Sequence, residues 1–165
     1  MPFLNPYELN LISSYFLIEV EPLCLIKDLT LLSNPIPELH PLSITKIPYF
    51  VALPLKNSNL LQIRLPSFLS KEFLCKKIDE EIKNKNEYSF VPEVIFVLGK
   101  EIIKNCYNSE CDNLNLLDNL KEIRFKKTLL GLENLDGSTL NLNNLTSFEF
   151  NEVKVMMCEG MKLIE

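Results

Sequence analysis

Side chains that commonly carry out catalysis are sparse in this chain. His40 is the single histidine, and it lies between Leu39 and Pro41 in a proline-rich stretch. A Ser-His-Asp or Cys-His apparatus would have to use this imidazole, and no G-x-S-x-G or similar nucleophile signature accompanies it. We therefore expect a structural or solvent-exposed role for His40. A small enzyme of unfamiliar type that uses His40 or a cysteine is the weakest of three functional hypotheses.

The five cysteines and four glycines do not have the spacing of a metal site, a disulfide framework or a nucleotide site. Cys106 and Cys111 are five positions apart, whereas a zinc site needs C-x₂₋₄-C with two further ligands. Cys158 lies far along the chain, and the cysteine count is odd. No G-x-G-x-x-G or phosphate loop exists. We expect buried or incidental thiols, no metal and no cofactor.

Two charged clusters have the density that chemistry would need. The acidic run Asp79–Glu81 is contiguous, so its members point in different directions around a helix, and a solvated face is the preferred interpretation. The densest positive cluster is Arg124 with Lys126 and Lys127. For these residues we expect salt bridges with Glu122 or with acidic groups of a partner, rather than contacts with DNA.

Composition also argues against several classes of protein. The net charge is −5 and there are only two arginines. Binding to the phosphates of nucleic acid needs clustered lysine and arginine, so a general nucleic-acid-coating protein is disfavoured. The start of the chain lacks the positive region of a signal peptide. The apolar stretch 11–25 contains two serines and two glutamates, which makes it unsuited to a bilayer. The scattered cysteines favour a reducing, intracellular compartment.

A small β-rich domain is expected over residues 1–62. Tyr15–Val20 has β-favouring residues, Leu23–Leu32 is a possible second strand, and the proline-rich segment 34–45 should be a loop. Pro48 can open a short helix to Lys56, which the internal Pro54 should kink or shorten.

Residues 63–165 are expected to form a helical domain. Helices are predicted over 67–85, 93–105, 114–133 and 146–164, with Glu80 and Glu81 on the outer face of the first. The fold class is therefore α+β, mainly α, with a small N-terminal β-containing domain followed by a C-terminal helical bundle. The helix from Glu93 is apolar nearly all round, so it must be buried on several flanks by the bundle itself or by a partner.

The last helix carries its own start signal. Thr146 and Glu149 have the spacing of a capping box. Helical spacing then places a row of apolar residues on one face, and we expect a neighbour to cover that face. The row contains Phe150, Val153, Met157, Met161 and Ile164.

Several of these segments together resemble the GINS complex of eukaryotic DNA replication. Ile47–Ala52 with Leu55–Lys56 resembles its hydrophobic-Pro-Leu-Trp-Leu-Ala segment, and Arg64–Leu69 resembles the Pro-containing turn into a helix. Glu122–Lys127 is similar to its acidic-x-Arg-x-x-Lys helix. Leu142–Asn151 is similar to the Leu-x-Asn-Leu-Thr-Leu-x-Glu-Ile-Asn stretch of the second "partner of Sld five" subunit. In this chain the β-containing part precedes the helical part. This order fits the second "partner of Sld five" subunit and, as the alternative, the third.

The resemblance implies a non-enzymatic nuclear scaffold. Each GINS subunit forms an obligate heterotetramer with three sister subunits. This tetramer joins the MCM helicase ring and the Cdc-forty-five protein, and it helps to couple the leading-strand polymerase. It implies DNA contact that is at most indirect, and no membrane. The motif and interface candidates are Pro48, Tyr49, Phe50, Phe68, Glu122, Arg124, Lys127, Leu145, Thr146, Glu149, Phe150, Met157 and Met161. A stand-alone adaptor that binds a peptide or helix in an apolar groove is the second hypothesis.

Overall fold

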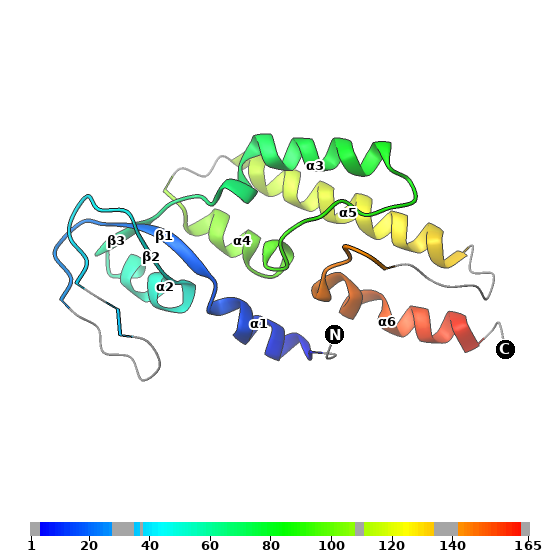
Figure 1. Cartoon of the computed structure of the whole chain (residues 1–165), viewed down its shortest axis with the longest axis horizontal. Coiled ribbons are helices and arrows are strands. Elements are labelled where there is room, and N and C mark those ends of the chain that lie inside the picture. Colours follow the sequence, from blue (N-terminus) through cyan, green and yellow to red (C-terminus); the bar gives the residue numbers. More distant parts are fainter. Residues whose placement is uncertain (1–3, 28–34, 37, 108–110, 134–141, 163–165) are drawn as a thin grey trace.

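A small sheet lies at one end of a helical bundle (Figure 1). The computed structural model describes residues 4–27, 35–36, 38–107, 111–133 and 142–162. Within these ranges the chain forms six α-helices, one 3₁₀ helix and a three-stranded antiparallel sheet. The expected mainly α, α+β fold class is confirmed.

The sheet has the order β2-β1-β3, with β1 over Leu17–Pro22, β2 over Thr45–Pro48 and β3 over Leu61–Ile63. The side chains of β1 alternate between exposed and buried, as a strand with one covered face requires. The predicted strand near residues 15–20 is confirmed. The prediction of a second strand is wrong for residues 23–27, which form no strand and contain only an isolated bridge between Ile26 and Leu39. The rest of that predicted strand, residues 28–32, lies outside the described ranges.

The short helix after Pro48 is confirmed as α2, Tyr49–Asn57. Pro48 occupies the N-cap position and Pro54 lies inside the helix. Tyr49 packs into the core and is 3% exposed. β2 ends at Pro48 and α2 begins at the next residue, Tyr49. No loop separates the strand from the helix, so the position of α2 is fixed by the sheet.

An additional helix, α1 over Pro6–Ser14, precedes the sheet and was not predicted. Asn5 and Glu8 form a capping box around its start, and Pro6 takes the first helical position. The helix packs against α4 and α6 and lies along the lower side of the bundle in Figure 1. The N-terminal segment therefore contributes to the bundle as well as to the sheet, and the domain division at residue 62 stays a prediction.

The helix predicted over 67–85 is two elements. A 3₁₀ turn, η1, covers Ser67–Leu69, and α3 covers Lys71–Lys83. Ser70 between them is extended (φ −67°, ψ 149°), and its hydroxyl accepts a hydrogen bond from the Phe73 N–H. The hydroxyl provides the cap that the start of a helix needs, so the serine begins a new helix.

Three further helices complete the bundle as predicted: α4 over Ile95–Asn105, α5 over Cys111–Glu133 and α6 over Ser147–Lys162. The burial expected for the helix from Glu93 is confirmed, because most apolar side chains of α4 lie in the core. A methyl group added at Gly99 would come within 3.0 Å of the Leu117 side chain and 3.3 Å of that of Leu69. The glycine therefore allows α4 to approach α5 and η1 closely.

Candidate functional site

Arg124 on α5 is a fully buried charge, with 0% of its surface exposed. Its Nε–H and one Nη2–H donate to the Glu149 carboxylate at 2.6 and 2.9 Å, and an Nη1–H donates to Glu81 at 2.5 Å. The carbonyl oxygens of Ser89 and Asn144 accept the remaining bonds at 2.9 and 2.8 Å. All five N–H groups of the guanidinium are therefore used. We call Arg124, Glu81, Glu149 and Lys127 the arginine centre.

Glu81 on α3 is almost completely buried and accepts four hydrogen bonds. The donors are Arg124, the Lys127 ammonium, and the backbone N–H and hydroxyl of Ser89 at 2.9 and 2.8 Å. Burial raises the pKa of Glu81, but bonds from Lys127 and Ser89 and the charge of Arg124 outweigh burial and hold the pKa below its usual value. The carboxylate is thus held in its charged form inside the protein.

Arg124 stays charged for the same reason. Burial lowers the pKa of the guanidinium, but its hydrogen bonds and ion pairs with Glu149 and Glu81 raise the pKa above its usual value. The Tyr88 ring covers the guanidinium at 5.1 Å, and the Tyr88 hydroxyl lies 2.9 Å from that of Thr128. The centre is enclosed, so it can hold α3, α5 and α6 together but offers no open face to a substrate.

The capping box at the start of α6 is confirmed and belongs to the same centre. The Glu149 carboxylate accepts hydrogen bonds from the Thr146 N–H at 3.0 Å and its hydroxyl at 2.8 Å. The Thr146 hydroxyl in turn accepts from the Glu149 N–H at 3.3 Å. One carboxylate therefore caps α6 and pairs with Arg124.

One expectation about charge is wrong, and another is confirmed in part. Glu81 is 1% exposed rather than on a solvated face. Lys126 of the basic cluster pairs with Glu122 at 2.6 Å as expected, whereas Arg124 and Lys127 pair with buried carboxylates of this chain. The missed signal is spacing: Arg124 continues the buried row of Leu117 and Leu120 along α5. In the same way Glu81 follows Leu74 and Ile78 along α3. A charge that continues an apolar row is a candidate for a buried pair.

Two of the described side chains in the apolar row of α6 are covered from within the chain. Val153 and Met157 are 1% and 5% exposed, and α6 packs on α1, α4 and α5. Phe150 and Leu145 are half-buried. The Met161 side chain and Ile164 lie outside the described part of the chain.

The candidates around α2 divide between core and surface. The Tyr49 hydroxyl lies 3.5 Å from the Asn105 amide nitrogen, which donates to it, and burial raises the pKa of Tyr49 to about 12. Phe50 is 37% exposed and its ring lies 4.9 Å from that of Tyr15. Phe68 packs edge-to-face on Phe16 at 5.7 Å. Pro48 is half-buried at the start of the helix.

Sequence reasoning missed an exposed apolar face because it missed α1. Tyr7, Leu11 and Tyr15 recur every four residues and are 83%, 63% and 54% exposed. Ile12 is exposed beside them, and Phe50 extends the surface through its contact with Tyr15. We call these five residues the α1 face. Contiguous exposed apolar side chains of this kind mark interaction sites.

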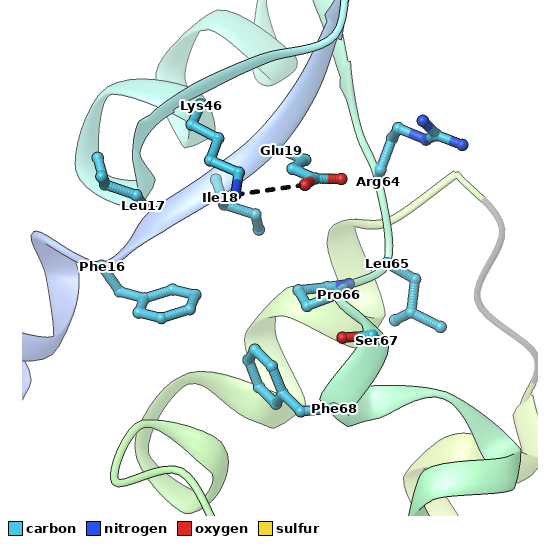
Figure 2. Close-up of a pocket in the computed structure, with 10 residues that line it drawn as sticks. All are labelled: Phe16, Leu17, Ile18, Glu19, Lys46, Arg64, Leu65, Pro66, Ser67 and Phe68. Atoms are coloured by element: carbon cyan, nitrogen blue, oxygen red, sulfur yellow. Dashed lines mark ion pairs between the residues drawn. The ribbon is translucent and has the colours of Figure 1, made fainter.

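A groove of about 420 Å³ lies between the sheet and η1. One wall is Phe16 with the first three residues of β1, and the other is 64–68, which follows β3 (Figure 2). Lys46 on β2 pairs with Glu19 at 3.6 Å along one rim. Among the residues predicted as motif candidates, Phe68 lines this groove.

The groups considered for catalysis or metal binding are not brought together. Within the described residues, no three His, Cys, Asp or Glu side chains form a group that could hold a metal ion. His40 is exposed, and Cys106 is buried with its pKa raised to about 12 by burial. The Cys111 side chain lies outside the described part. No helix described here has the length and apolar character needed to span a bilayer.

Comparison with known proteins gives a family assignment. No protein-family model matches the chain. It is 44% identical to the probable DNA replication complex GINS protein PSF2 of Encephalitozoon cuniculi, over 93% of this chain and 89% of that protein. It is 29% identical to the psf2 protein of Schizosaccharomyces pombe, over 95% and 87%, and 28% identical to PSF2 of Candida albicans, over 92% and 76%. The likeness to the second "partner of Sld five" subunit is thereby confirmed, and the chain belongs to the PSF2 family of DNA replication complex GINS proteins.

Proposed function

We propose that the chain is a non-catalytic structural subunit of a GINS heterotetramer and acts in nuclear DNA replication. The observation that carries this proposal is the 44% identity to a GINS protein over nearly the full length of both chains. Its partners are three sister subunits.

Side-chain chemistry supports a scaffold over an enzyme. The charged groups most strongly perturbed by burial, Arg124 and Glu81, are saturated by the chain's own donors and acceptors. A catalytic acid or base needs access to a substrate, which these groups lack. Their arrangement instead suits a rigid joint between three helices.

The α1 face supports permanent assembly. Its five side chains expose apolar surface that water solvates poorly. Obligate interfaces are more apolar than transient ones and resemble a domain core cut in half. We place a sister subunit on this face because its exposed apolar side chains gather along one helix, whereas Val153 and Met157 of the α6 row are already covered from within the chain.

The wider role in the proposal rests on the resemblance to GINS proteins. We include in the proposal that the tetramer joins the MCM ring and the Cdc-forty-five protein to form the active replicative helicase, with a link to the leading-strand polymerase. The net charge of −5 supports DNA contact that is at most indirect, because binding to the phosphate backbone needs clustered cations.

Co-expression tests the proposal. The chain produced with its three sister subunits should purify as one assembly with a single copy of each, whereas the chain alone should aggregate. Size-exclusion chromatography with light scattering distinguishes these results. A monodisperse monomer with a cooperative melt, which ignores the co-expressed sisters, would contradict the proposal.

A further inference from the structure

The groove between β1 and η1 opens where two paired segments separate. The Arg64 N–H donates to the Glu19 carbonyl at 3.0 Å, which continues the pairing of β3 with β1 by one step. The chain then turns through Leu65 and Pro66 into η1. The part of β1 before Glu19 is left without a partner on that side among the described residues.

The backbone of Leu17 faces this gap. The Phe16 carbonyl accepts from the Tyr49 N–H on the β2 side, at 2.9 Å, and the Glu19 carbonyl accepts from Arg64 on the β3 side. Successive residues of an antiparallel strand direct their N–H and C=O groups to opposite neighbours. The groups of Leu17 therefore point into the groove, where an added extended segment could bond to them.

The charge of the groove is set by Arg64. Two of the 17 basic side chains in this chain are arginines. Arg124 uses all its donors internally, whereas Arg64 is exposed, and no ion pair joins its guanidinium to the described residues. Glu19 and Lys46 pair with each other, so the groove carries a positive charge on a protein of net charge −5. A guanidinium binds a carboxylate through two parallel bonds, which a lysine cannot do.

The rest of the groove is apolar. The Phe16 and Phe68 rings lie on the far side of it from Arg64, and Pro66 lies between them and Arg64, whose side chain extends outward at the rim (Figure 2). The volume of about 420 Å³ falls within the roughly 300–1,000 Å³ of ligand pockets. This surface fits an apolar or aromatic side chain next to the acidic one.

We propose that this groove binds an extended segment of a partner protein other than the sister subunits, and that the segment carries an acidic residue beside an apolar one. The segment adds to the sheet at Leu17, its carboxylate pairs with Arg64, and its apolar side chain packs on Phe16 and Phe68. The proposal concerns a surface apart from the α1 face, so it does not depend on tetramer formation.

Peptide selection tests this inference. A phage library of random twelve-residue peptides is selected on the intact complex, or on the full chain if it purifies alone. Selected peptides are synthesised with the acidic residue and with its amide analogue. We expect enriched peptides with an acid next to an aromatic or branched side chain, and protection of the 16–18 amides from hydrogen exchange when peptide is bound.

Variants assign the carboxylate contact to Arg64. Affinity should fall at least tenfold in Arg64→Gln and by a smaller factor in Arg64→Lys. It should be unchanged in Lys126→Gln, an exposed cation on α5. The amide analogue should lose as much affinity as Arg64→Gln, with no further loss when the two changes are combined.

Several results would overturn the inference. They are the absence of enriched peptides, equal binding to Arg64→Gln, and unprotected 16–18 amides in the bound state. Loss of a sister subunit from the Arg64→Gln complex would also overturn it, because the groove would then belong to the tetramer interface. Failure to form any tetramer would count against the proposed function alone.

Discussion

At the scale of single residues, the arginine centre decides how the bundle is held. A buried ion pair gains little over apolar packing, but removal of one partner leaves an unpaired buried charge. Arg124 has two such partners, Glu81 and Glu149, on two different helices. The centre therefore specifies how α3 and α6 are placed on α5. Its loss should lower the stability of the whole bundle.

Replacing Arg124 with methionine tests this role. Arg124→Met leaves Glu81 and Glu149 buried without the guanidinium, so the free energy of unfolding should fall by about 3–5 kcal/mol. Lys126→Met, two residues away and exposed, is the control and should change stability by less than about 0.5 kcal/mol. Urea denaturation of the purified assembly measures both. Equal stability of the two variants would show that the centre is not a structural joint.

Glu81 gives the stability a dependence on pH. Its pKa is below the usual value in the folded protein, so its charge stabilises the fold above the pKa of the unfolded chain, about 4.3. That contribution is lost as the pH falls through the folded pKa. Glu81→Gln should therefore be less stable than the natural protein at pH 7, and the difference should shrink below about pH 4. Thermal melts from pH 7 to pH 3 measure the difference, and a constant gap would contradict this view.

At the scale of elements, sequence motifs that lie within a single helix, such as a helix cap or an apolar periodicity, predicted the structure well. The Thr146–Glu149 box predicted the start of α6, and Pro48 predicted α2. The apolar periodicity of α4 predicted its burial. These features depend on residues close together in the sequence, which is why one sequence was enough.

The elements that were missed depend on distant parts of the chain. β2 and β3 are four and three residues long, and they are strands because β1 lies between them. α1 buries only Leu9 and Ser13, and its regularly spaced apolar residues are exposed, so it lacks the buried apolar row of the other helices, although Asn5 and Glu8 marked its start. To predict the arginine centre, Arg124 and Glu81 would have to be recognised as continuations of apolar rows. Their ion-pair partners are on other helices, which the sequence does not reveal.

The capping box gives a prediction for α6. Thr146→Ala removes the hydroxyl that accepts from Glu149 N–H and should reduce stability by about 1 kcal/mol. Ser147→Ala, at the first position of the helix, is the matched control and should have a smaller effect. Denaturant midpoints compare them. A control as damaging as Thr146→Ala would mean that the cap adds nothing beyond general packing.

At the scale of the whole molecule, the covered and open apolar surfaces lie on different elements. Val153 and Met157 of the α6 row are buried by neighbouring helices of the same chain, whereas the α1 face is open. This division separates folding from assembly. Met157→Asp should unfold the chain, because its side chain is 5% exposed within the chain itself, whereas changes on the α1 face should affect partners first.

The double variant Tyr7→Asp/Leu11→Asp tests the assembly surface. Both side chains are exposed, so the circular dichroism spectrum should stay that of the folded chain, while incorporation into the tetramer should fall at least tenfold. Ile82→Asp on α3, on the opposite side of the bundle from α1 in Figure 1, is the exposed apolar control. Normal incorporation of the double variant would show that sister subunits bind elsewhere.

Native mass spectrometry of the chain co-expressed with its three sister subunits tests the central claim most directly. We predict a single assembly that contains one copy of each chain, from which the Tyr7→Asp/Leu11→Asp chain is absent. A folded chain that is recovered by itself, with the three sisters assembled without it, would contradict the claim that it is a structural GINS subunit.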